Sequence, residues 1–173
     1  MSHRIIEDEI TARQHELIGS LLRESFPDYP QRSYFKQIPQ FRLLDWRGEK
    51  LLAHAGVEHR VIRNGDSILR IFGVIDLCVA SAERSRGLAS RLLTDLESLA
   101  RSAGVDAIVL VADDSRVYDA AGYSMVENSA RWVMINDHET IGIAERPLAG
   151  LMVKMLGTKT WQPGLVDFLG YLF

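Results

Sequence analysis

Cysteine is almost absent from this chain, which has a single one, Cys78, among 173 residues. One cysteine excludes an internal disulfide and a cysteine-rich metal site. Its place within an apolar stretch predicts a small buried side chain. The five histidines are scattered and lack the spacing of metal ligands, so we expect no metal.

A large excess of either charge is also missing. Lysine and arginine number 20 against 23 aspartates and glutamates, which gives a net charge of −3 and a pI of about 5.9. With no basic excess, we expect no nucleic-acid partner. No apolar run approaches the roughly 18 residues of a membrane span, and the start, Met-Ser-His-Arg, lacks a hydrophobic signal segment. We therefore expect a cytoplasmic protein with no membrane partner.

The length and the apolar content are sufficient for one domain with a real core. Apolar residues make up 47% of the chain and charged residues 25%, as in ordinary globular proteins. The sequence shows no repeat, no low-complexity segment and no interior linker. We predict a single domain over residues 1–173.

The most informative stretch runs from Ile71 to Ala103. Residues 71–79 are apolar apart from Asp76, which predicts a strand buried on both faces. A polar turn with Gly87 follows, and then a helix with one apolar face that ends at Gly104. Strand, short turn and helix together direct free backbone N–H groups and a helix dipole to one point, which attracts phosphate.

The other elements are predicted from periodicity and turn residues. Thr11 opens a helix with Gln14 completing a capping box, and Asn64-Gly65 marks a two-residue hairpin turn. From the polar side chains of residues 137–150, we predict an irregular segment there. Short helices are expected at Gln31–Gln37 and within Asp113–Tyr123, and strands at Arg4–Glu9, Phe41–Trp46, Lys50–Ile62, Ser67–Val79, Ala107–Val111, Ala130–Ile135, Leu151–Leu156 and Leu165–Phe173.

The pattern Arg84-x-x-Gly87-x-Ala89 resembles the acetyl-CoA pyrophosphate loop of the GNAT (GCN5-related N-acetyltransferase) superfamily. Tyr118 through Tyr123 resembles the Tyr-x-x-x-Gly-Phe/Tyr element of that superfamily, although the Asn that usually precedes it is replaced by Asp or Ser. The resemblance implies an α/β GNAT acyl-CoA N-acyltransferase fold: a mixed, mainly antiparallel central sheet flanked by helices, with one parallel β-α-β unit. Residues 51–173 are more loosely similar to aminoglycoside 2′-N-acetyltransferases and NodA-type N-acyltransferases.

The same resemblance implies acetyl-CoA as co-substrate and direct transfer of its acetyl group to a primary amine of a small molecule, aminoglycoside-like or polyamine-like. Backbone groups at the end of the central strand would bind the pantetheine, and the loop would bind the diphosphate. Arg84 and Arg86 are either diphosphate ligands or solvated surface arginines. The expected cofactor-binding residues are Leu77, Cys78, Val79, Arg84, Ser85, Arg86, Gly87, Leu88, Ala89 and Ser90.

Two catalytic residues are expected. Tyr118 matches the residue that protonates the CoA thiolate in many members, whereas Tyr123 is expected in the core. Asp76 is the candidate general base, because burial in the central strand would raise its pKa. His54 and His59, the terminal carboxylate of Phe173, and a water chain without a dedicated base stay open as alternatives; Glu58 is expected to be solvated.

The sequence leaves the acceptor and the acyl chain open. One alternative function is a non-catalytic acyl-CoA sensor, and another is an N-acyltransferase that uses longer acyl chains or a protein or peptide amine. Trp161, Tyr171 and Phe173 fit either packing, an acceptor pocket or a subunit contact, so a homodimer is among the expectations.

Overall fold

The structure is a computed structural model that describes residues 2–173, and the chain divides into two compact units. The first unit runs up to Glu58 and includes Val74–Glu97, and the second comprises His59–Gly73 and Ser98–Phe173. The strands β3 (Lys50–Asn64) and β4 (Ser67–Val79) and the helix α2 (Leu88–Ser102) each contribute residues to both units. The expectation of a single domain stays a prediction.

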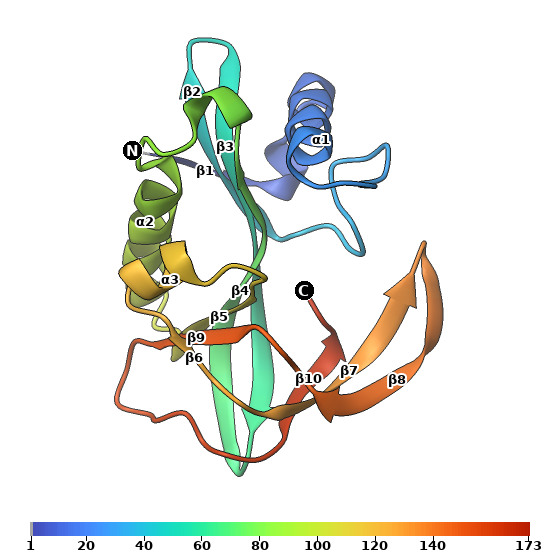
Figure 1. Cartoon of the computed structure of the whole chain (residues 1–173), viewed down its shortest axis with the longest axis vertical. Coiled ribbons are helices and arrows are strands. Elements are labelled where there is room, and N and C mark those ends of the chain that lie inside the picture. Colours follow the sequence, from blue (N-terminus) through green and yellow to red (C-terminus); the bar gives the residue numbers. More distant parts are fainter. Residues whose placement is uncertain (1) are drawn as a thin grey trace. The chain divides into compact units, whose positions relative to one another are not determined.

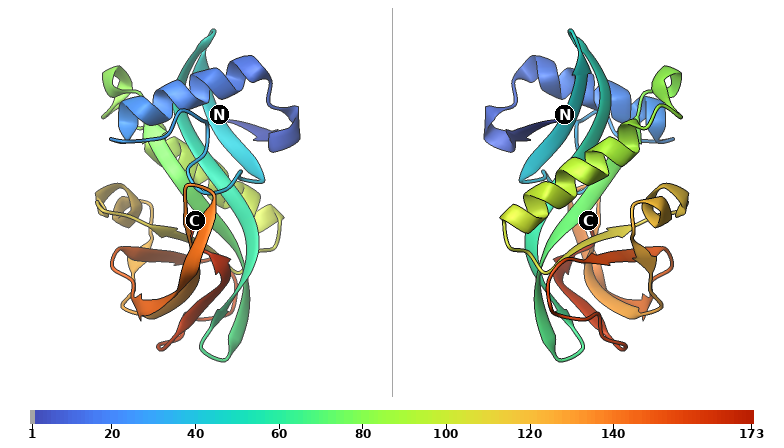
Figure 2. Two further views of the ribbon diagram at one scale, coloured as in Figure 1. Left: turned by 90° about the vertical axis from the view of Figure 1, so that its right-hand side faces the viewer. Right: turned by 90° about the vertical axis from the view of Figure 1, so that its left-hand side faces the viewer.

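The first unit is a small antiparallel sheet with a helix on each face. β1 (His3–Ile6) pairs with β2 (Phe41–Arg47), which pairs with β3 from Phe41↔Val57 to Arg47↔Lys50. The helix α1 (Ala12–Ser25) and the first part of α2 lie on opposite faces of these strands (Figures 1 and 2). Two 3-10 turns, Glu7–Glu9 and Ser81–Glu83, precede α1 and α2. The expected strand over Arg4–Glu9 therefore ends at Ile6.

The helix α1 begins as predicted. The Thr11 side chain accepts from the Gln14 backbone N–H, and the Gln14 side chain accepts from the Thr11 backbone N–H, which completes the capping box. The apolar face of the helix packs into a core cluster with β2, β3 and the end of β4. The buried members of that cluster are Ile10, Ile18, Leu21, Leu22, Tyr29, Leu44, Leu51, Cys78 and Ala80.

The predicted helix at Gln31–Gln37 is wrong, because residues 26–40 form an irregular segment of bends and turns. The side chain of Arg32 replaces the helical hydrogen bonds here. Its Nε donates to the Tyr34 carbonyl at 3.1 Å and its Nη2 to the Phe35 carbonyl at 2.7 Å. Pro30 and Pro39 restrict the backbone at both ends of the stretch.

The second unit is built on a mixed sheet with the strand order β6-β9-β5-β4-β3-β10-β7-β8. As predicted, β5 runs parallel to β4, with Ile71 opposite Ala107 and Gly73 opposite Val109, and α2 connects the two strands. β10 also pairs with β7 in parallel, whereas the other pairings are antiparallel. The elements are β5 (Ala107–Val111), α3 (Arg116–Ala120), β6 (Ser124–Met125), β7 (Ser129–Asn136), β8 (Glu139–Pro147), β9 (Leu151–Met155) and β10 (Val166–Tyr171).

The prediction of an irregular segment at 137–150 is wrong, because most of it is the strand β8. Asp137 and His138, both with positive φ, form the turn that joins β7 to β8, and the two strands pair along their whole length. The side chains of Ile141 and Ile143 are 59% and 70% exposed. A strand with so little burial has no alternation of apolar and polar residues, so the sequence shows no strand signal.

The predicted β3–β4 turn is displaced by one residue. Gly65 and Asp66 form the turn, and Asn64 is the buried last residue of β3. The Asn64 amide group donates to the Gln162 carbonyl at 2.9 Å and accepts from the Gln162 backbone N–H at 2.6 Å. Asn64 thus fixes the 157–165 loop to this hairpin through one donated and one accepted hydrogen bond with the Gln162 backbone, the pattern that a paired strand residue makes.

Gly73 and Phe173 are in tight contact within the second unit. A Cβ atom added at Gly73 would lie 2.6 Å from two ring carbons of Phe173, closer than real Cβ contacts. The Phe173 ring also packs edge-on against the buried Phe168 ring, with centroids 5.5 Å apart. Glycine at position 73 is therefore required for the Phe173 ring to occupy its place on β4.

We predict that Gly73→Ala destabilises the protein by about 1–3 kcal/mol, because overpacking displaces the Phe173 ring. The free energy of unfolding from urea titrations measures the effect. In a Phe173→Ala background the same substitution should be neutral or stabilising, since alanine is better than glycine in a strand. An equal cost in both backgrounds would contradict the contact.

Candidate functional site

The loop before α2 is exposed and has an unusual backbone conformation. Ser85 and Gly87 have φ of 60° and 76°, and residues 84–87 are exposed. The two positive-φ residues turn the chain sharply between the extended Arg84 and the start of α2. The first-turn N–H groups of α2, from Leu88 to Ser90, have no partner within the helix, and the helix dipole adds to the positive potential. A Cβ at Gly87 would meet nothing within 4 Å, so the loop is open.

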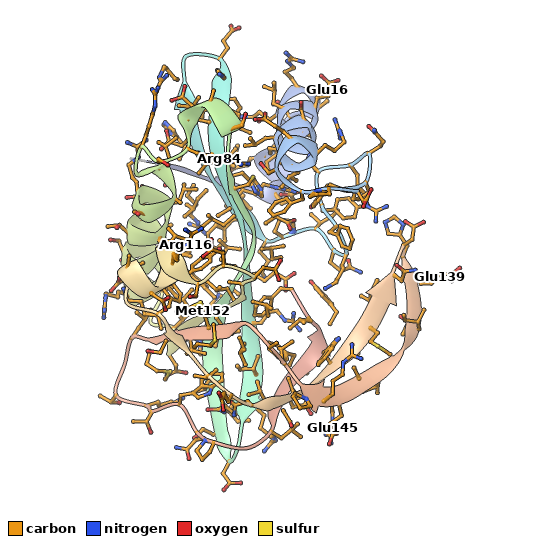
Figure 3. All side chains as sticks on the ribbon, in the orientation of Figure 1. Glu16, Arg84, Arg116, Glu139, Glu145 and Met152 are labelled. Carbon is orange, nitrogen blue, oxygen red and sulfur yellow. The ribbon has the colours of Figure 1, made fainter. Side chains whose placement is uncertain are left out.

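Buried Glu83 anchors this loop to the sheet of the first unit. It accepts two hydrogen bonds from Arg47, at 2.9 and 3.1 Å, and one from Arg86 at 3.2 Å. The Arg47 contact holds the pKa of Glu83 below its usual range. Arg84, labelled in Figure 3, donates only a long 3.4 Å bond to the Val79 carbonyl and forms no ion pair within residues 2–173. Of the two loop arginines, Arg84 therefore has the weaker contacts, because Arg86 is paired with Glu83.

The strand β4 changes its backbone conformation at Asp76, where φ is 52°. This left-handed conformation costs a non-glycine residue about 1–2 kcal/mol, so the surrounding contacts must hold it. Leu77, Cys78 and Val79 follow and complete the strand. Burial raises the pKa of the Cys78 thiol to about 12, which makes it a protonated core group near neutral pH.

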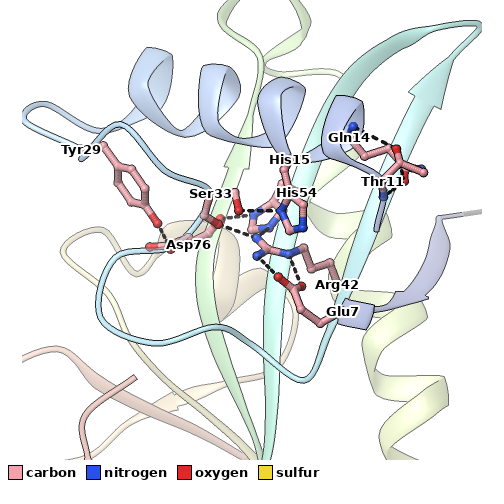
Figure 4. Close-up of polar contacts among 9 residues, drawn as sticks. All are labelled: Glu7, Thr11, Gln14, His15, Tyr29, Ser33, Arg42, His54 and Asp76. Carbon is pink, nitrogen blue, oxygen red and sulfur yellow. Dashed lines mark hydrogen bonds and ion pairs between the residues drawn. The ribbon is translucent and has the colours of Figure 1, made fainter. Parts of the chain in front are cut away.

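The Asp76 carboxylate is half-buried and has a direct partner that the sequence did not reveal. The Tyr29 hydroxyl donates to Oδ2 of Asp76 at 2.5 Å (Figure 4). Burial raises the pKa of Asp76, while the Tyr29 hydrogen bond and the charges of Arg42 and Lys36 act in the opposite direction. The pKa of Tyr29 is raised by burial and by the negative charge of Asp76, so the phenol keeps its proton.

A buried chain of polar contacts supports the main chain of Asp76. Arg42, 1% exposed, makes two bonds to Glu7, at 2.7 and 2.8 Å, and its Nη1 lies 3.0 Å from Nε2 of His54. Nδ1 of His54 lies 2.9 Å from the Asp76 carbonyl oxygen (Figure 4). Because arginine can only donate, His54 Nε2 accepts and its Nδ1–H donates to Asp76.

His54 is consequently a neutral structural group and not a general base. Burial, together with the charge of Arg42, lowers its pKa to about 3. Both ring nitrogens are occupied by these contacts. His59, the other histidine considered from the sequence, is exposed and lies edge-on to Phe72 at 5.2 Å.

Glu58 contradicts the expectation that it is solvated, because it is only 3% exposed. It faces Lys36, a half-buried lysine of the irregular 26–40 segment that also faces Asp76. Burial lowers the pKa of Lys36, and the two carboxyl groups partly offset this. The 26–40 segment covers this part of β3, where the Gln40 backbone N–H donates to the Val57 carbonyl at 3.1 Å.

Tyr118 lies on α3 in the second unit. Its ring packs against that of Tyr123 with centroids 5.9 Å apart, and Tyr123 is buried as expected. The helix has five residues and begins after Ser115, whose hydroxyl donates to the Asp119 carboxylate and makes no cap hydrogen bond with the backbone. The Asp114 carboxylate accepts from the Arg116 backbone N–H instead, and Figure 3 labels Arg116 at this helix.

Two further properties concern the described residues 2–173 as a whole. They contain no group of three or more His, Cys, Asp and Glu side chains that could hold a metal ion. None of their helices combines the length and apolarity that crossing a membrane requires.

Comparison with known proteins identifies a family of acetyltransferases that share this fold. The profile described as "Acetyltransferase (GNAT) family" matches residues 11–123, well over half of the chain. The Escherichia coli GNAT family N-acetyltransferase YhbS, solved in complex with CoA, is 18% identical with a TM-score of 0.63; the alignment covers 96% of this chain and 89% of that one. A GNAT family acetyltransferase from Brucella melitensis, solved with acetyl-CoA, is 14% identical with a TM-score of 0.60, covering 94% of this chain and 93% of that one.

Eis1 from Mycobacterium abscessus is 16% identical with a TM-score of 0.61, and the alignment covers 76% of this chain but 33% of that one. Likeness to solved structures at such identities shows the fold alone. No curated protein sequence matched the chain.

The mixed sheet with its parallel β4-α2-β5 crossover matches the fold of acyl-CoA N-acyltransferases. The family match makes the assignment definite: this chain belongs to the acetyltransferase (GNAT) family and is an acyl-CoA N-acyltransferase, an enzyme of class EC 2.3.1.

We predict that Gly87→Asp weakens CoA binding by at least about tenfold, because a carboxylate in the loop repels the diphosphate and position 87 has a left-handed backbone. Isothermal titration with CoA measures the dissociation constant. Gly48→Asp is the matched control, since Gly48 has φ of 59° and equally open surroundings in the β2–β3 turn. Equal affinities for the two variants would show that the diphosphate binds elsewhere.

Proposed function

We propose that this enzyme transfers the acetyl group of acetyl-CoA directly to a primary amine of a small molecule, aminoglycoside-like or polyamine-like. The observation that carries the proposal is the half-buried Asp76 carboxylate. It stands on β4, immediately before the residues proposed to bind pantetheine and a few residues before the anion-binding loop. A proton acceptor and an acyl-CoA site on one strand are what amine acetylation requires.

Acetyl-CoA is proposed to bind along the end of β4 and the following loop. Main-chain groups of Leu77, Cys78 and Val79 would pair with the pantetheine amides as an added strand does. The open backbone loop at Arg84–Gly87 and the start of α2 at Leu88–Ser90 would hold the diphosphate. Arg84 is the proposed side-chain ligand, because Arg86 is already engaged with Glu83.

Asp76 is proposed to remove the proton from the acceptor. An ammonium has no lone pair, so the amine must lose a proton before it can attack. Burial raises the pKa of Asp76 and so brings it closer to the range in which a carboxylate is an effective base. The carboxyl groups of Asp76 and Glu58 also favour a cationic acceptor over an anionic one, with Lys36 offsetting part of their charge.

The transfer itself conserves atoms and charge. The neutral amine forms a bond to the thioester carbonyl carbon, the carbon–sulfur bond breaks, and the departing thiolate takes a proton from the Tyr118 phenol, while the nitrogen releases its second proton to water as it becomes an amide. The phenol and the Asp76 carboxylic acid then return to their starting states by exchange with water. The overall products are an acetamide, free CoA and one proton. Cys78 takes no part, because its buried thiol stays protonated.

We predict that Asp76→Asn lowers kcat/KM by at least about tenfold, equivalent to about 1.4 kcal/mol of barrier, because the amide cannot accept a proton. The measurement is release of free CoA thiol across a panel of aminoglycosides, polyamines, amino acids and peptides. Asp66→Asn, in the exposed β3–β4 turn, is the matched control and should keep the wild-type rate. In wild-type enzyme, activity should fall as the pH decreases through the raised pKa of Asp76.

Tyr118→Phe should lower kcat by at least about tenfold while the affinity for CoA stays unchanged, because only the proton donor to the thiolate is lost. Thiol release and CoA titration calorimetry separate the two effects. A rate within about twofold of wild type would remove Tyr118 from the mechanism. CoA binding without thiol release for any amine would indicate a sensor, and faster use of longer acyl chains would revise the acyl donor.

A further inference from the structure

We propose that Tyr29 is a positioning residue for this reaction: its hydroxyl holds the Asp76 carboxylate ionised and in one orientation, so that Oδ1 of Asp76 receives the proton from the acceptor ammonium. The inference rests on the proposed role of Asp76 as the base. Tyr29 lies in the irregular 26–40 segment, 47 residues away in sequence, and no motif marks it.

The placement of Tyr29 is well defined by its packing. Its side chain is 8% exposed and belongs to the core cluster of the first unit. Its ring packs against those of Phe26 and Phe35, with centroids 6.0 and 5.5 Å away. The residue before it, Asp28, has φ of 61°, which turns the chain so that the phenol reaches β4. A buried side chain whose ring packs against two others keeps its hydroxyl at one place.

The two oxygens of the Asp76 carboxylate have different surroundings. Oδ2 accepts from Tyr29 at 2.5 Å, whereas Oδ1 accepts no hydrogen bond from residues 2–173. A carboxylate fixed through one oxygen presents the other in a single direction. Oδ1 is therefore the atom that meets the acceptor, and Tyr29 decides which way it points.

Each of the other charged or titratable groups near Asp76 is less suited to this role. Arg42 is already paired with Glu7, and His54 is neutral and contacts the Asp76 main chain. The Cys78 thiol, on the same strand, stays protonated. Lys36 is half-exposed, and its charge lowers the pKa of Asp76 less than the Tyr29 hydrogen bond does. Tyr29 is the group that donates directly to the carboxylate.

Electrostatics determine whether the loss of the Tyr29 hydroxyl raises or lowers the pKa of Asp76. A phenol that keeps its proton can only donate to the carboxylate, and donation favours the ionised form. Without the Tyr29 hydroxyl, only the charges of Arg42 and Lys36 oppose the effect of burial on the pKa of Asp76. Asp76 then binds a proton at higher pH. Tyr29 thus lets a buried carboxylate remain a base at a pH where burial alone would leave it protonated.

The test is the pH profile of kcat/KM for Tyr29→Phe, with thiol release as the assay and the best amine from the panel as acceptor. We expect the acid limb to move upward by about one pH unit, with about tenfold lower activity below the limb and a plateau at high pH within about threefold of wild type. Tyr34→Phe, which removes a hydroxyl from the same segment, is the matched control and should leave the limb in place.

Three outcomes would overturn the inference. These are an unmoved acid limb, an equal loss of activity at every pH, and a limb that moves equally in Tyr34→Phe. An equal loss at every pH is what a purely structural role would produce. If Asp76→Asn itself keeps full activity, the proposed base is wrong, and this result is distinct from an unmoved limb in an enzyme that needs Asp76.

A second substitution keeps the test valid if Tyr29→Phe folds poorly, which thermal unfolding would reveal. 3-Fluorotyrosine at position 29 preserves the ring and the packing but makes the phenol a stronger donor. The acid limb should then move below that of wild type. A limb that stays in place or moves upward would contradict the role of Tyr29.

Discussion

The hydrogen bond between Tyr29 and Asp76 links the irregular 26–40 segment to the central strand, and much of the first unit is arranged to make it. A carboxylate that is half-buried and placed on a left-handed residue is unfavourable on two counts, desolvation and backbone strain. Packing of the Tyr29 ring and the support of the Asp76 carbonyl by His54 offset both. The result is a carboxylate, the proposed base, whose side chain and main chain are each held by a buried partner.

The two parts of the proposed acetyl-CoA site have opposite structural requirements. The loop before α2 must be exposed and sharply turned, and the left-handed conformations of Ser85 and Gly87 provide the turns. The Asp76 site needs burial and fixed side chains. Glu83 joins the two requirements, since this buried carboxylate ties Arg47 on β2 to Arg86 in the exposed loop. The sheet of the first unit thereby carries a loop that remains open, as the proposed diphosphate site requires.

The elements around the loop before α2 were predictable because their signals are local. The strand Ser67–Val79, the helix that begins at Leu88 and the parallel strand Ala107–Val111 all have the predicted bounds or orientation. The predictions failed where tertiary contacts replace local ones. Arg32 satisfies carbonyl groups that a helix would otherwise satisfy, and β8 is a strand only because β7 pairs with it.

The sequence by itself determined the strand–loop–helix unit and with it the family, because Gly87, the helix period and the β-branched run act over a few residues. It also pointed to Asp76, the one charge in an apolar strand. Only the tertiary structure decided what surrounds that charge: Tyr29, His54 and Arg42 come from three different segments, and no local pattern specifies which buried polar groups will meet. Such pairings form because buried donors and acceptors must find hydrogen-bond partners once the chain has folded. Which partners are available depends on the fold of the whole unit.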